Sequence, residues 1–263
     1  MKKNNSFLKY ISIGFWSVKE VFMYPANLFG RLAIYVVRIM AFGWIYQSLF
    51  KINPSVSEIT AVEAVWSLSF VQLVYQSSGH VFNDFQNDVK SGNIATQINK
   101  PYNFLYSKYA KLFIGGVFKF IIFSIATVIV LIPAFGIPEI TFTMILTVII
   151  LCLLGVLLNI LVECSIGMLA FWIEETGPVY QVFSRLAWLF NGTFVPVAIL
   201  PEWMKIFSLI YPLGIPFVVG RIFEDSFNTV FVMIILLLWI ILFFVINNLM
   251  FKNANKRIAI HGG

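Results

Sequence analysis

Two long apolar runs constrain the fold of this chain more than any other feature. The runs ITFTMILTVIILCLLGVLLNILV (residues 140–162) and FNTVFVMIILLLWIILFFVINNLM (residues 227–250) contain no Asp, Glu, Lys or Arg. A helix of about 20 apolar residues crosses the hydrocarbon core of a bilayer, where a single charge costs at least about 2.5 kcal/mol. Only 11% of the 263 residues are charged and the mean hydropathy is +0.89. We therefore expect a polytopic membrane protein.

Windows of this kind predict six membrane-spanning helices. Their approximate bounds are 26–50, 60–80, 112–132, 140–162, a fifth span from near Val179 to near Pro196, and 227–250. The runs are continuous and do not alternate with a period of two, which excludes a closed β-barrel. The predicted fold class is therefore all-α. It forms one transmembrane domain over residues 1–263, with the bundle at 26–250 and a tail at 251–263.

Lysine and arginine predict the orientation of this bundle. If the N-terminus is cytoplasmic, six spans return the C-terminus to the same side, and the inner segments hold most of the basic residues of the loops: Lys2, Lys3, Lys9, Lys19, Lys90, Lys100, Lys108, Lys111, Lys252, Lys256 and Arg257. The outer loops hold only Lys51, Lys205 and Arg221. This bias favours a cell-membrane protein with both termini in the cytoplasm. We interpret the net charge of +6 as a consequence of this topology and of attraction to anionic lipids, and expect no nucleic-acid partner. The composition, rich in Asn, Lys and Ile, is typical of a bacterium with an AT-rich genome.

The first 24 residues predict an amphipathic helix. Apolar residues recur at helical spacing at Phe7, Leu8, Ile11, Phe15, Val18 and Phe22, with polar residues between them. No small-residue cleavage site follows, so the segment is not interpreted as a signal peptide. We predict that the helix lies in the inner membrane interface, and the alternative is an extension of the first span into the cytoplasm.

Charged residues inside the predicted spans are candidates for function because they are expensive in lipid. Arg31 and Arg38 lie seven residues apart, near one face of the first span. Arg38 is either a member of a structural ion pair, with Glu163 as the candidate partner, or part of a path that meets an anionic or zwitterionic substrate. Lys119 and Arg185 are close enough to the inner ends of their spans to extend to the interface.

The segment between the fifth and sixth spans stays apolar but cannot form one continuous helix. It contains Pro196, Pro201, Pro212 and Pro216, with Trp203 among them. Proline removes a backbone donor and breaks a helix. The segment predicts short re-entrant helices in the outer leaflet, and the alternative is a hydrophobic loop resting on the bilayer surface.

A polar segment, DVKSGNIATQINKPYNF (residues 88–104), interrupts this apolar sequence. Its first part is a turn signal, and the residues after Asn93 suggest a short helix before the third span. The run DVKSGNIATQINKPYNFLY resembles a cytoplasmic loop of type-2 ATP-binding cassette (ABC) permeases, with Ile98 where the family pattern usually has Leu. The run FNGTFVPVAILPEWMKIFSLIYPLGIPFVVGRIF is similar to the segment that follows the fifth helix in the same family.

The resemblance implies that the loop from about Asp84 to Lys100 docks into a separate ATPase. The residues implied in this coupling loop are Asp84, Asp88, Gly92, Asn93, Ile94, Gln97, Lys100 and Pro101. It also implies a cytoplasmic ABC ATPase dimer and a second permease chain, identical or related, as partners. The chain has no Gly-x-x-x-x-Gly-Lys-Ser/Thr loop, so ATP and Mg would be held by the partner and not by this chain.

The function that the resemblance implies is ATP-driven export of an amphipathic substrate such as a peptide, lipid or drug. An ion-coupled secondary transporter or channel is the alternative. An intramembrane enzyme is disfavoured, because the predicted spans show no paired carboxylates, no nucleophile with a base and no metal motif. We therefore expect no catalytic, cofactor-binding or metal-binding residues on this chain.

Overall fold

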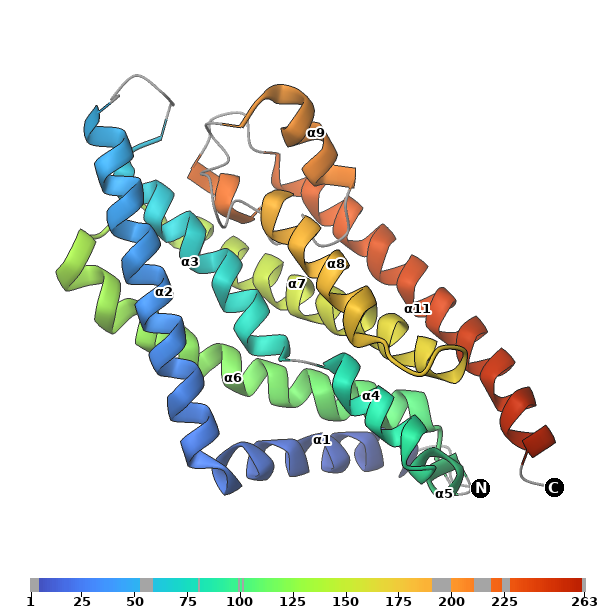
Figure 1. The fold of residues 1–263 in the computed structure, drawn as a ribbon. Helices are drawn as coiled ribbons and strands as arrows, with labels where there is room; N and C mark the ends of the chain where they lie inside the picture. Colours follow the sequence, from blue (N-terminus) through green and yellow to red (C-terminus); the bar gives the residue numbers. More distant parts are fainter. Residues whose placement is uncertain are drawn as a thin grey trace.

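The computed structural model describes residues 5–52, 59–79, 81–98, 100, 102–190, 200–210, 219–223 and 228–261, and the regular elements among them are helical (Figure 1). In chain order these are α1 (Asn5–Met23), α2 (Pro25–Ile52), α3 (Ala61–Ser78), α4 (Val81–Lys90), α5 (Asn93–Ile98), α6 (Phe104–Phe135), α7 (Phe142–Met168), η1 (Leu169–Phe171), α8 (Gly177–Phe190), α9 (Glu202–Ile210), η3 (Val219–Phe223) and α11 (Thr229–His261). The predicted all-α class is confirmed over the described residues.

Among the described residues, four helical segments are long and apolar enough to cross a membrane. They are Pro25–Ile52, Phe104–Phe135, Phe142–Phe171 and Thr229–Asn255, which correspond to the first, third, fourth and sixth predicted spans. The second predicted span corresponds to α3, which carries several glutamines and serines and is largely buried. The fifth corresponds to α8, whose 14 residues extend only about 21 Å. The number of six spans therefore stays a prediction.

The third span was predicted too short. Its helix, α6, begins at Phe104, where the Asn103 side chain accepts a hydrogen bond from the Tyr106 N–H at 3.2 Å. It continues through Pro133, which lies in the last turn, so only Ala134 and Phe135 follow the proline in the helix. The Gly136 N–H then donates to the Ile132 carbonyl at 3.0 Å and closes the last turn.

The N-terminal helix α1 is separated from α2 at Tyr24 and turns sharply away from it (Figure 1). It packs along α6, where Glu20 pairs with Lys111 at 2.7 Å and the rings of Phe22 and Phe118 lie 5.3 Å apart. It is therefore not a straight extension of the first span. The apolar side chains of Leu8, Phe15 and Trp16 on α1 are exposed. The predicted position in the membrane interface requires such exposed apolar residues.

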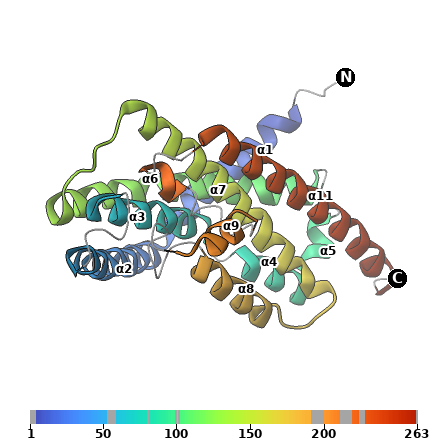
Figure 2. The ribbon, with the colours of Figure 1, turned by 90° about the horizontal axis from the view of Figure 1, so that it is seen from above.

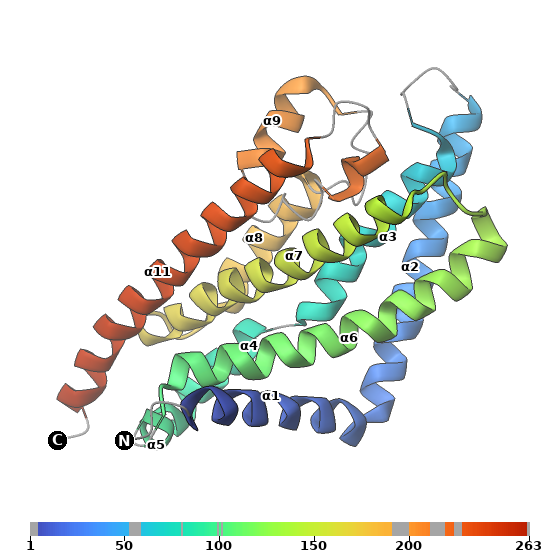
Figure 3. The same ribbon diagram turned by 180° about the vertical axis from the view of Figure 1, so that it is seen from behind.

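The centre of the bundle is α7, which contacts α3, α4, α6 and α11 (Figure 2). Its C-terminal half is buried almost without interruption, because these neighbours surround it. The start of α1, the helix α5 and the end of α11 lie at one end of the molecule, and α9 and the end of α2 lie at the other (Figures 1 and 3). The side of the membrane on which each terminus lies stays a prediction.

Only part of the predicted re-entrant segment is described. Pro196, Pro212 and Pro216 lie outside the described residues. Pro201 precedes α9, and its carbonyl accepts from the Met204 N–H at 2.9 Å. Trp203 on α9 is exposed, and Ser208 donates a hydrogen bond to the Phe190 carbonyl at 2.9 Å, which folds α9 back against the end of α8. The re-entrant arrangement stays a prediction.

Candidate functional site at the break between α3 and α4

The chain breaks from α3 into α4 inside the bundle. Gly79, at the break, has a positive φ of 80°, a conformation that favours glycine. Such a break leaves carbonyl groups at the end of α3 and N–H groups at the start of α4 without partners in their own helices. In a membrane these groups need partners from the protein. The second predicted span ended at His80, so the helix that follows at once is a finding of the structure.

The start of α4 is capped by the carboxylate of Glu163, which projects from α7. One carboxylate oxygen accepts hydrogen bonds from the Val81 N–H at 2.6 Å and the Phe82 N–H at 3.4 Å. The other accepts from the Asn159 side-chain amide at 3.2 Å. Glu163 is only 1% exposed. A negative group at this position also complements the positive end of the helix dipole.

The end of α3 is complemented by a cation. The Arg31 guanidinium, from α2, donates to the Gln76 carbonyl in the last turn of α3 at 2.7 Å. One turn earlier on α3, the Gln72 side chain accepts from Arg38 at 3.1 Å. Of the two alternatives for Arg38, the ion pair with Glu163 is not formed: Glu163 holds the start of α4, and Arg38 donates to a glutamine of α3 instead. The sequence could not show that α3 offers this partner.

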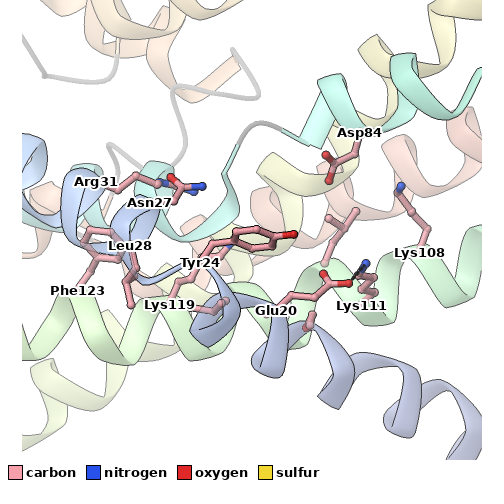
Figure 4. Close-up of a pocket in the computed structure, with 14 residues that line it drawn as sticks. Glu20, Tyr24, Asn27, Leu28, Arg31, Asp84, Lys108, Lys111, Lys119 and Phe123 are labelled. Atoms are coloured by element: carbon pink, nitrogen blue, oxygen red, sulfur yellow. Dashed lines mark hydrogen bonds and ion pairs between the residues drawn. The ribbon is translucent and has the colours of Figure 1, made fainter. Parts of the chain in front are cut away.

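Two cavities lie against the break and share the lining residues Asn27, Arg31, Asp84, Leu112 and Lys119. Their volumes are about 670 Å³ and about 210 Å³. Figure 4 shows the smaller one, with Arg31 from α2, Asp84 from α4 and Lys119 from α6 around it. The larger one extends to Arg38 and to α8 at Trp188. Charged side chains therefore line the space beside the break.

Lys119 lines both cavities. It lies in the middle of α6, because this helix begins eight residues earlier than the predicted third span. A methyl group built on Gly79 would lie 3.5 Å from both the Lys119 ammonium and the Arg31 guanidinium. Within the described part of the chain, no carboxylate forms an ion pair with Lys119. Lys119 was predicted to extend to the inner interface. In the structure it lies beside the break instead.

Side chains of α4 fix this helix to the rest of the bundle. Asp88 pairs with Lys108 of α6 at 2.6 Å, and both side chains are mostly buried. Lys90 pairs with Glu175 in the connection after α7. Asp84 and Asp88, predicted in a docking loop, therefore lie on a helix, where one lines the cavities and the other anchors α4.

The segment after α4 matches the prediction of a turn followed by a short helix. Gly92 in the turn has a φ of 69°, and α5 begins at the next residue. Ile94 is 3% exposed and belongs to the core, so it is not available to a partner as its predicted docking role requires. The side chains of Asn93, Thr96 and Lys100 are exposed, and that of Gln97 is partly exposed. Pro101 lies outside the described residues.

Sequence reasoning missed Asn159, which lies one turn before Glu163 on α7. Its amide group donates to Ser78 at the end of α3 as well as to Glu163, so it joins both sides of the break. A polar residue four positions before a carboxylate, inside an apolar run, is a signal that could have identified this pair.

The Lys90–Glu175 contact predicts a dependence of stability on pH. The hydrogen bond from Lys90, aided by its charge, holds the pKa of Glu175 below the ordinary value for glutamate, about 4.3. A lowered pKa in the folded state stabilises the protein above the unfolded pKa, and this contribution is lost as the pH falls through the folded value. We expect the melting temperature in detergent to exceed that of Glu175→Gln at pH 6 and the difference to shrink as the pH falls below the ordinary glutamate value of about 4.3.

The matched control is Glu174→Gln, which removes the same charge at the neighbouring exposed position. A pH profile of Glu175→Gln that parallels the unmodified protein throughout this range would contradict the assignment.

Comparison with known proteins identifies the family of the chain. Neither a curated protein nor a solved structure matches it. The family model described as ABC-2 family transporter protein matches residues 32–262, which is nearly the whole chain and includes the break, α5 and α9. The apolar helices agree with this family's character as a multi-pass membrane transport subunit. The chain therefore belongs to the ABC-2 family of transporter proteins, as a type-2 ABC permease.

Proposed function

We propose that this permease exports an amphipathic substrate, with energy from ABC ATPase subunits that bind at α5. The observation that carries the proposal is the position of α4. One end of this helix leads into α5, and its other end forms the wall of the charged cavities, where Glu163 holds its first N–H groups. A movement of α5 is therefore passed along one short helix to the cavities.

The packing of α4 supports this transmission. Besides its ion pairs, α4 has the Phe82 ring stacked on Tyr180 of α8, with ring centroids 4.0 Å apart. It also crosses α7 closely, with Phe82 and Phe85 against Gly167. These contacts join α4 to three other helices. Closure of the ATPase dimer would move α5, and α4 would then change the packing around the break.

The rest of the proposal follows from the family and the arrangement of the helices. Six crossings would use α3 and α8 as the second and fifth, and would place both termini and α5 in the cytoplasm of a bacterial cell. ATP and Mg would bind to the partner ATPases. A second permease chain, identical or related, would bind this one in a symmetric assembly. The translocation path would lie at the interface between the two chains.

An ion-coupled transporter is the second candidate, because Arg38 and Lys119 occupy the middle of α2 and α6. Charges at such depth are typical of ion and proton pathways. Transport by the reconstituted permease under a proton or sodium gradient, with no ATPase present, would favour this candidate. Transport that requires both ATP and the ATPase would exclude it.

Replacing Thr96 with arginine is expected to abolish stable binding of the ATPase. Thr96 is exposed on α5, so the new charge changes the docking surface and leaves the core unchanged. A buried like-charge contact or an unpaired charge at an interface costs about 2–5 kcal/mol, which corresponds to at least a thirtyfold loss of affinity. The measurement is copurification of the tagged permease with its ABC ATPase in mild detergent.

The control is Asn253→Arg, which adds the same charge at an exposed position in the C-terminal part of α11. The end of this helix lies at the same end of the molecule as α5 (Figure 1). We expect this variant to retain the ATPase. Full retention of the ATPase by the Thr96 variant would place the docking surface elsewhere.

A further inference from the structure

We propose that the larger cavity binds the anionic head group of an amphipathic molecule, with Lys119 as a direct ligand of its phosphate or carboxylate. The inference deepens the proposed function, because it names the chemical class of the transported substrate. The volume of the larger cavity, about 670 Å³, falls in the range of small-molecule sites, about 300–1,000 Å³.

The charges of the cavity select an anion. Arg31, Arg38 and Lys119 line it, and among its described lining residues Asp84 is the one carboxylate. Glu163 does not line the cavity, and it already accepts hydrogen bonds from the N–H groups of α4. Positive charge that is held in a bundle surrounded by lipid and only partly compensated by the protein favours an anionic ligand.

The three cations differ in how much of their hydrogen-bonding capacity is used. Arg31 and Arg38 each donate to a group of α3, and a guanidinium has further N–H donors. Lys119 forms no ion pair in the described part of the chain. Its ammonium has three donors and lies near Arg31 across Gly79. An oxyanion between these two side chains would meet both of them.

The mouth of the cavity favours an anion that carries an apolar chain. Ile34 lines the cavity and is 58% exposed, and Val37 and Trp44, which follow on α2, are 67% and 56% exposed. These residues form an apolar stripe that leads away from the cavity on the outer surface of α2. An anionic head group would bind inside the cavity, and its acyl chain would pack along this apolar stripe.

The test measures binding of a fluorescent phosphatidic acid analogue to the full chain in a neutral detergent, without ATPase or nucleotide. We expect unlabelled phosphatidic acid to compete and phosphatidylcholine to compete at least about tenfold more weakly. Lys119→Met should weaken binding about tenfold or more, and Lys119→Arg should retain it within about threefold. Asp84→Asn should tighten binding severalfold, an effect that a purely structural role would not produce.

The control is Lys252→Met, which removes an exposed lysine of α11 away from the cavities and should leave binding unchanged. Competition by inorganic phosphate as strong as that by phosphatidic acid would support the anion site and assign its ligand to a soluble molecule. Equal competition by the two lipids, or unchanged binding by Lys119→Met, would overturn the proposal. Since no ATPase is present, this result is independent of whether α5 binds one.

Discussion

Replacing Glu163 with alanine is expected to destabilise the folded protein by about 3 kcal/mol or more. The substitution leaves the N–H groups of Val81 and Phe82 without their carboxylate acceptor in a buried part of the bundle. An unsatisfied buried donor costs about 1–3 kcal/mol, and the removed side chain also leaves a cavity. Burial of the Glu163 carboxyl group has a desolvation cost in the native protein, but removing one partner from a buried arrangement of this kind is still unfavourable.

The measurement is the free energy of unfolding in bicelles, or the melting temperature in detergent. Glu163→Gln is the matched variant, because its amide oxygen can still accept from both N–H groups of α4. We expect its loss to be about 1 kcal/mol. Equal stability of the alanine variant and the unmodified protein would show that Glu163 does not hold the start of α4.

Replacing Gly167 with valine is expected to displace α4 from α7 and to reduce stability by about 2–3 kcal/mol. A methyl group at this position would lie 2.6 Å from the Phe85 Cβ and 2.8 Å from the Phe82 carbonyl oxygen. Neither atom can move by a side-chain rotation, so the whole helix must shift. The two extra methyl groups of valine increase the overlap. Because α4 carries α5, we also expect weaker copurification of the ATPase.

The matched control is Gly30→Val in α2, where no atom lies within 4 Å of the added carbon. We expect it to change the melting temperature by only a few degrees, because no neighbour has to move and the helix propensity of valine is no lower than that of glycine. A Gly167 variant as stable as the Gly30 variant would show that α4 and α7 are not held in close contact.

The spans that the sequence predicts best are those whose apolar runs are continuous and free of charged residues. For α7 and α11, length and hydropathy alone are sufficient, because the segments 140–162 and 227–250 contain no charge. The α3 helix is harder, because Gln72 and Gln76 make it resemble a weak span. Both lie at the break, where Gln72 accepts from Arg38 and the Gln76 carbonyl accepts from Arg31. Polar side chains with hydrogen-bond partners inside the bundle lower the mean hydropathy of a segment, but the segment still forms a helix.

The candidate site was only partly predictable for a similar reason. The turn at Gly92 and the short helix after it follow from local turn chemistry, which the sequence carries. The Glu163 cap and the position of Lys119 depend on contacts between residues far apart in the chain. The α4 helix was missed, although Val81, Phe82 and Phe85 have helical spacing and are buried. The segment from Asp84 onward was predicted to belong to the docking loop instead.

The most direct test of the account is photo-crosslinking from α5 in native membranes. A photoreactive amino acid is placed at Thr96, whose side chain is exposed, and the crosslinked products are identified by mass spectrometry. We expect the ABC ATPase as the main product, with a yield that changes when nucleotide is trapped on the ATPase. The same probe at Asn253 of α11 serves as the reference. Crosslinks from Thr96 to lipid or to extracytoplasmic proteins, with none to an ATPase, would contradict the account.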